Sequence, residues 1–182
     1  MIEKVRSGMF ASIPVRYRSS DISQCLDCVP NGISYDKSYF ITGPCGSGKT
    51  HLAVAIMKEL IINSKMDASS LLECHFSSFP ETIALVKDSF GGKDSAVDAL
   101  RSACKCKGVA IIDDICFLKA GETEVNSLLI MVNYRYANCL PSIYTANLSL
   151  KEISKLYGDR LASRLASCEQ IDLTGKKDRR LS

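Results

Sequence analysis

The residues with the clearest chemical meaning form a short run of glycines that ends in a lysine and a threonine. The run is Gly43, Pro44, Cys45, Gly46, Ser47, Gly48, Lys49 and Thr50, which satisfies the spacing G-x4-G-K-[ST]. Such glycines let backbone N–H groups point inward at an anion, and a helix that starts near Lys49 adds its positive end. The pattern predicts a phosphate-binding loop, with Lys49 on the β- and γ-phosphates and the Thr50 hydroxyl on Mg2+.

Two adjacent carboxylates form the second chemical signal. Asp113 and Asp114 follow the apolar run 109–112, about 60 residues after the glycine-rich loop. Side chains at the carboxyl ends of parallel strands face the ligand crevice of an α/β sheet. We expect Asp113 to hold Mg2+ and Asp114 to orient or polarise the water that attacks the γ-phosphate.

Polar residues later in the chain fit the same chemistry but have ordinary explanations too. Asn147 follows an apolar run, where it could reach the γ-phosphate or the attacking water, or simply form a turn. Arg160 and Arg164 are four residues apart on one helical face, which is either solvated or directed at a neighbouring subunit's nucleotide. Arg179 lies in a basic tail that is either solvated or closed over the phosphates.

An alternation of strands and helices must position these residues. The predicted strands are 39–42, 71–77, 109–112, 142–146 and 170–173, and the predicted helices are 50–62, 79–90, 95–104, 122–137, 150–156 and 159–166. This order predicts a parallel α/β sheet.

Composition narrows the class of protein but not its partner. The chain has 182 residues, of which 46% are hydrophobic and 24% charged, so one domain with a real core is expected. No apolar run is long enough for a transmembrane helix or a secretory leader, so we expect a cytoplasmic protein without a membrane partner. The net charge of +3 does not by itself favour nucleic acid.

Nine cysteines are the unusual feature of the composition. Without a leader they are expected as reduced thiols. The close pairs Cys25/Cys28 and Cys104/Cys106 raise the alternative of zinc, which would need four well-placed ligands. We therefore favour small buried hydrophobic side chains.

Taken together, the motifs resemble the DnaC/DnaI helicase loaders and IstB-type ATPases, a family of AAA+ proteins. The resemblance covers nearly the whole chain, from about residue 10 to the C-terminus. Its segments are 13–18 before the core, a Walker A motif that extends through His51, Leu52 and Ala53, a Walker B motif at 111–114, a sensor 1 region at 133–148, a box VII at 158–165 and a sensor 2 at 173–180.

The resemblance implies a P-loop NTPase of the AAA+ type, a three-layer α/β/α fold with a five-stranded parallel sheet and a minimal C-terminal lid. The AAA+ domain would span 13–182, after a short extension at 1–12. ATP or ADP and Mg2+ would bind at subunit interfaces, with His51 in the nucleotide site. Arg164 would be the arginine finger, and Arg179 the sensor 2 arginine, with Arg180 as its alternative in register. Asp114 stands where most AAA+ ATPases have Glu, so hydrolysis is expected to be slow and stimulated by a partner or DNA.

The resemblance also implies a role in loading or remodelling a hexameric replicative helicase on single-stranded DNA. The usual helicase-binding module is expected to be missing or reduced to residues 1–11. Two alternatives stay open: an IstB-like ATPase that assists a transposase, and a nucleotide-gated binding module with little hydrolysis. The DNA-contact candidates are Lys87, Lys93, Arg101, Lys105 and Lys107, with interleaved acids that equally suit a mixed solvated surface.

Overall fold

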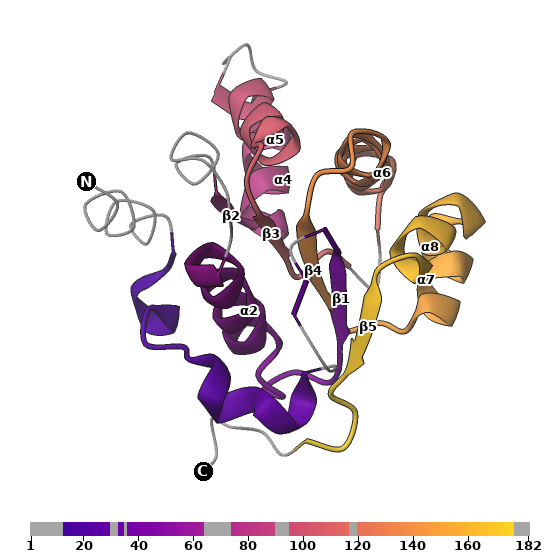
Figure 1. The fold of residues 1–182 in the computed structure, drawn as a ribbon. Coiled ribbons are helices and arrows are strands. Elements are labelled where there is room, and N and C mark those ends of the chain that lie inside the picture. Colours follow the sequence, from indigo (N-terminus) through magenta and orange to yellow (C-terminus); the bar gives the residue numbers. More distant parts are fainter. Residues whose placement is uncertain are drawn as a thin grey trace.

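A single parallel sheet lies at the centre of the computed structural model, which describes residues 13–29, 33–34, 36–63, 74–89, 95–116 and 120–176 (Figure 1). Its five strands have the order β2-β3-β4-β1-β5. They are β1 (Tyr39–Thr42), β2 (His75–Ser78), β3 (Ala110–Asp113), β4 (Ser142–Ala146) and β5 (Glu169–Asp172). The helices are η2 (Val15–Tyr17), η3 (Ile22–Cys28), α2 (Lys49–Asn63), α4 (Phe79–Ser89), α5 (Ser95–Lys105), α6 (Glu122–Ala137), α7 (Leu150–Tyr157) and α8 (Asp159–Ala166).

Helices cover both faces of the sheet and make a three-layer structure. Ile41 and its neighbours on one face pack against α2, which is apolar on most sides and buries Leu52 and Ile56. Phe40 and Ile112 point to the other face, where they pack against α4, α5, α6, α7 and α8. Alternate side chains along each strand therefore pack into two separate cores, one on each face of the sheet. The predicted three-layer α/β/α fold with five parallel strands is confirmed.

Most predicted elements agree with the structure, and the differences lie at the ends. The helices predicted at 122–137 and 159–166 and the strands at 39–42 and 142–146 have the predicted bounds. β2 begins at His75 rather than residue 71, while 64–73 lie outside the described residues. β5 occupies Glu169–Asp172, one residue earlier than predicted, because Glu169 N donates to Ser38 O and opens the pairing with β1.

The N-terminal part of the domain forms a segment that the hydrophobic pattern did not predict. We call residues 13–29 the strap. It consists of the 3-10 helices η2 and η3 and runs along α2 (Figure 1). Two of its own residues, Ile13 and Cys25, are buried in the core that α2 shares with the sheet. Asp21 caps η3 by accepting from Ser23 N at 2.8 Å.

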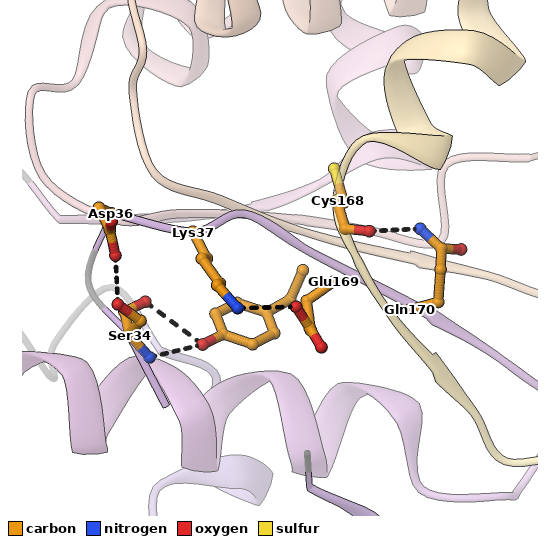
Figure 2. Close-up of polar contacts among 7 residues, drawn as sticks. Ser34, Asp36, Lys37, Cys168, Glu169 and Gln170 are labelled. Carbon is orange, nitrogen blue, oxygen red and sulfur yellow. Dashed lines mark hydrogen bonds and ion pairs between the residues drawn. The ribbon is translucent and has the colours of Figure 1, made fainter. Parts of the chain in front are cut away.

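The amino-terminal edge of the sheet is closed by polar contacts. Figure 2 shows Lys37, before β1, paired with Glu169 at the start of β5, with 3.1 Å between Nζ and Oε2. Nearby, Arg135 of α6 is fully buried and donates to the carbonyl oxygens of five residues, Ala103, Cys104, Cys106, Gly108 and Pro141, at 2.8–3.2 Å. Arg135 thus joins the end of α5 to the starts of β3 and β4.

In the part of the chain that the structure describes, no helix is long and apolar enough to cross a membrane.

Candidate nucleotide site

The glycine-rich loop connects β1 to α2 at the carboxyl edge of the sheet. A side chain at Gly43 would place its Cβ 2.9 Å from Leu173 Cβ and 2.8 Å from Ser47 Oγ, so the loop closes only around glycine. Gly48 has a φ of 94°, a left-handed conformation that glycine adopts without strain. These positions set the loop so that α2 begins directly at Lys49.

Lys49 is folded inward over the loop. Its Nζ donates to Gly43 O at 2.9 Å, to Pro44 O at 2.8 Å and to Asn147 Oδ1 at 2.5 Å. The residue is only 8% exposed. The ammonium group therefore lies between the phosphate loop of β1 and the residue that follows β4, which is where the motif requires a phosphate-binding cation.

Asp113, at the end of β3, is fixed by two hydroxyl groups. Thr50 Oγ1 donates to its carboxylate at 3.0 and 3.1 Å, and Thr145 Oγ1 donates to Oδ1 at 2.7 Å. The same Thr145 oxygen accepts from Asp114 N at 2.8 Å. Thr145 therefore sets the positions of both acids, a role that a threonine inside an apolar strand does not reveal in the sequence.

Asp114 turns the other way and contacts the end of β4. Its φ is 56°, and its Oδ1 accepts from Asn147 Nδ2 at 2.9 Å. Because Asn147 Oδ1 also accepts from Lys49, one amide side chain links the cation of the loop to the second acid. The predicted neighbours Lys49, Asp114 and Asn147 thus meet in one network.

Burial sets the protonation behaviour of the two acids. Desolvation raises the pKa of Asp113 above its ordinary value, and the hydrogen bonds from Thr145 and Thr50 oppose that rise. Desolvation also raises the pKa of Asp114, while the charge of Lys49 acts in the opposite direction. A cation bound between these two carboxylates and the loop would therefore stabilise their charged forms.

These groups line one cavity of about 290 Å³. Its walls are Arg16, Tyr17, Cys45, Gly46, Gly48, Lys49, Thr50, His51, Asp113, Asp114, Thr145 and Asn147. Arg16 and Tyr17 come from the strap. In the sequence they were identified only as part of segment 13–18 of the family resemblance, because no periodic pattern connects them to the loop. The cavity thus joins residues from four separate parts of the chain.

Two predicted arginines are not in this cavity. Arg164 lies on α8 and lines a different cavity, at the amino-terminal edge of the sheet together with Glu169. Its Nη1 donates to Arg160 O at 3.0 Å, and its guanidinium carbon is 5.4 Å from the centre of the Tyr136 ring. Arg179 falls outside the described residues. An action of Arg164 on a nucleotide would therefore need a second copy of the chain.

The cysteines are free thiols in several environments. Five are buried, namely Cys25, Cys74, Cys104, Cys106 and Cys116, while Cys45 and Cys139 are exposed. Burial raises the pKa of the Cys74 thiol to about 11. Among the described residues no cluster of three or more His, Cys, Asp or Glu side chains could hold a metal ion.

Comparison with known proteins places these features in a family. The model of the IstB-like ATP binding protein family matches residues 31–168. The chain belongs to this family. It is therefore a P-loop protein of the ATP-binding AAA+ class, and the resemblance inferred from the motifs is confirmed.

Two curated relatives and one solved structure are similar to it. YqaM of Bacillus subtilis is 29% identical over 133 residues, which cover 70% of this chain and 39% of YqaM. The replicative helicase loader DnaC of Escherichia coli is 26% identical over 128 residues, covering 70% of this chain and 49% of DnaC. The chain thus spans less than half the length of these relatives. A crystal structure of the DnaC helicase loader matches 87% of this chain and 99% of its own, with a TM-score of 0.67 and 20% identity.

Proposed function

We propose that this protein hydrolyses ATP and uses the reaction to load or remodel a replicative DNA helicase on single-stranded DNA. The observation that carries the ATPase proposal is the network in which Asn147 joins Lys49 to Asp114 while Thr50 and Thr145 hold Asp113. The helicase partner rests on the similarity to DnaC of Escherichia coli, which is a replicative helicase loader.

The phosphate end of ATP would lie in the loop. Lys49 now donates to two loop carbonyls and an amide, and these neutral acceptors can be exchanged for phosphate oxygens, which bind an ammonium more strongly. Loop N–H groups and the start of α2 add positive potential at the same place. The triphosphate is therefore expected to displace Lys49 from Asn147.

Asp113 and Thr50 suit Mg2+. They present carboxylate and hydroxyl oxygens to the same point, with 3.0 Å between Thr50 Oγ1 and Asp113 Oδ1, and Mg2+ prefers such oxygen ligands. When bound with ATP, the ion would neutralise charge on the phosphates. Thr145 would keep the Asp113 carboxylate aimed at that point.

Asp114 and Asn147 would act on the attacking water. The amide of Asn147 holds the Asp114 carboxylate at 2.9 Å, and release of Lys49 would free its oxygen to accept from that water. Asp114 would take the proton or polarise the water. Because the side chain of Asp114 is short, we expect basal ATP turnover to be slow. We expect the helicase or DNA to stimulate it.

Arg164 is proposed to act across an interface between copies of the chain, and Arg179 and His51 to contribute to the nucleotide site. The position of Arg164 on the edge opposite to the cavity supports action in trans, because the side chain cannot serve its own cavity. DNA contact is proposed for Arg101, Lys105 and Lys107, which are exposed. Of the other two candidates, Lys87 is paired with Glu124 at 2.5 Å and Lys93 lies outside the described residues.

The test is the ATPase rate measured against protein concentration, with Arg164→Ala mixed into the parent protein. We expect the rate per chain to rise with concentration, and the variant to lower the rate of the mixture by more than its share. A rate independent of concentration, together with a fully active variant, would contradict action in trans.

A nucleotide-gated module with little hydrolysis is the second candidate, because Asp114 replaces the usual Glu. A single-turnover measurement separates the two: the ATPase proposal expects phosphate release within minutes, whereas the module would retain ATP. Co-purification with a helicase or with a transposase, each tested with and without ATP, decides between the loader and the transposition helper.

A further inference from the structure

The strap takes part in the nucleotide cavity although it lies far from the loop in sequence. Arg16 and Tyr17 of η2 line the cavity beside Thr50 and His51. At its other end, η3 helps to enclose a second cavity of about 220 Å³ on the flank of the phosphate loop, where Ser47 Oγ is buried without a hydrogen-bond partner. The strap therefore covers the loop on two sides, and its position determines the shape of the site.

His51 joins the strap to the nucleotide loop. Its Nδ1 lies 3.0 Å from the buried hydroxyl of Ser20, and its Nε2 lies 3.0 Å from Oε1 of Gln24. Because an amide oxygen can only accept, Nε2 carries a proton and donates to Gln24, and in the neutral imidazole Nδ1 then accepts from the Ser20 hydroxyl. A neutral imidazole has one donor and one acceptor, and here each meets a complementary atom of the strap.

A second clamp lies on the same side of α2. Lys58 follows His51 by two helical turns and therefore shares its face. Its Nζ donates to the backbone oxygens of Ser20, at 2.9 Å, and of Arg18. The two clamps differ in position, since His51 directly follows the Mg2+ candidate Thr50 whereas Lys58 lies two turns away from it.

We propose that His51 is a positioning residue that couples nucleotide binding to the strap. It holds Ser20 and Gln24, and this contact places Arg16 and Tyr17 over the cavity. ATP at the loop would stiffen the first turn of α2 and, through His51, the strap.

This inference rests on the proposed nucleotide site and is tested by the affinity for Mg-ATP in titration calorimetry. Ser20 and Gln24 lie outside the lining of the cavity, so the double variant Ser20→Ala/Gln24→Ala loosens the strap and leaves the loop intact. We expect this variant and His51→Ala each to bind ATP about tenfold more weakly. The triple variant should be no weaker than His51→Ala, because all three residues serve one contact.

Ser23→Ala is the matched control. It removes a hydroxyl from the same 3-10 helix, but that hydroxyl contacts Asp21 within the strap, so ATP affinity should not change. If the Ser20/Gln24 variant binds like the parent while His51→Ala is weak, His51 acts on the nucleotide directly and the proposal is overturned. If all variants bind like the parent, the strap is not coupled to the site.

Hydrogen exchange gives a readout that a purely structural role of His51 would not change. In the parent, saturating ATP should slow amide exchange in residues 13–28, and in His51→Ala at saturating ATP this slowing should disappear. An equal slowing in both proteins contradicts the coupling. Failure of Lys49→Ala to weaken ATP binding would instead show that the nucleotide site itself is wrong.

Discussion

The two edges of the sheet each hold a buried cation surrounded by carbonyl oxygens, yet only one of them is arranged for a ligand. Lys49, at the carboxyl edge, is 8% exposed and has two backbone carbonyls and one amide as partners, beside a cavity of about 290 Å³. Arg135, at the amino edge, is 0% exposed and donates to five carbonyls and to Ser142 Oγ at 2.6 Å.

The difference lies in whether the partners can be replaced. Of the acceptors of Lys49, Asn147 lines the cavity and Pro44 is exposed, so phosphate oxygens can replace both, and only Gly43 O is buried. The acceptors of Arg135 are buried carbonyls at the end of α5 and in the loops before β3 and β4. Pro141 O also accepts from Ala110 N at 3.1 Å, and no carboxylate contributes to the set among the described contacts. Arg135 therefore stabilises the fold, while Lys49 is kept available for a ligand.

The largest effect is expected at Arg135. Arg135→Met removes the guanidinium donor from five buried carbonyls, of which Pro141 O keeps Ala110 N as a donor, so we expect the free energy of unfolding to fall by about 4 kcal/mol or more. Urea unfolding followed by circular dichroism measures this loss. A variant as stable as the parent would show that Arg135 is not needed for stability, and the two edges would then not differ in the role of their buried cation.

Lys49→Met tests whether the cation at the carboxyl edge contributes to stability. Pro44 is exposed and its carbonyl keeps Ser47 N as a donor at 3.3 Å, so only Gly43 O loses a buried contact, and we expect the free energy of unfolding to fall by about 1 kcal/mol. The same urea experiment applies. A loss as large as that at Arg135 would show that Lys49 is a structural cation.

Asn147→Ala should separate binding from chemistry at the carboxyl edge. It releases Lys49 and leaves Asp114 without its amide partner, so we expect hydrolysis to slow by about 100-fold with ATP affinity within a few-fold of the parent. Single-turnover phosphate release and calorimetry measure the two quantities. An unchanged rate would exclude Asn147 from the reaction.

Thr145→Val should have a smaller effect. It removes the hydroxyl that orients Asp113 and accepts from Asp114 N, while its volume and strand preference stay similar. We expect a roughly tenfold slower hydrolysis and a higher Mg2+ requirement. Ser142→Ala, at the opposite end of β4, is the control for general weakening of that strand.

The carboxyl edge could be predicted from sequence because its chemistry lies in local motifs. The run from Gly43 to Thr50 and the pair Asp113/Asp114 each follow a short apolar strand, and that context gives both their conformation and their place. Asn147 followed from the same rule. The order of the strands was not predicted; β4 lies between β3 and β1, and this order brings the three strand ends together.

The remaining features could not be predicted, for identifiable reasons. The strap has no helical or strand periodicity, so its 3-10 turns and the placement of Tyr17 in the cavity had no local signal. Arg135 occurs in an ordinary helix, where an arginine suggests an exposed face rather than a buried one. Thr145 looks like a common strand residue. In each case the function depends on contacts between segments far apart in the chain.

The most direct test of this account is a calorimetric titration of Mg-ATP into the parent protein and into Lys49→Ala. The account predicts that the parent binds ATP at one site per chain and that the variant binds at least about 100-fold more weakly, because the phosphates lose a charged donor. Equal affinity in the two proteins would contradict the assignment of the loop and of the cavity around it.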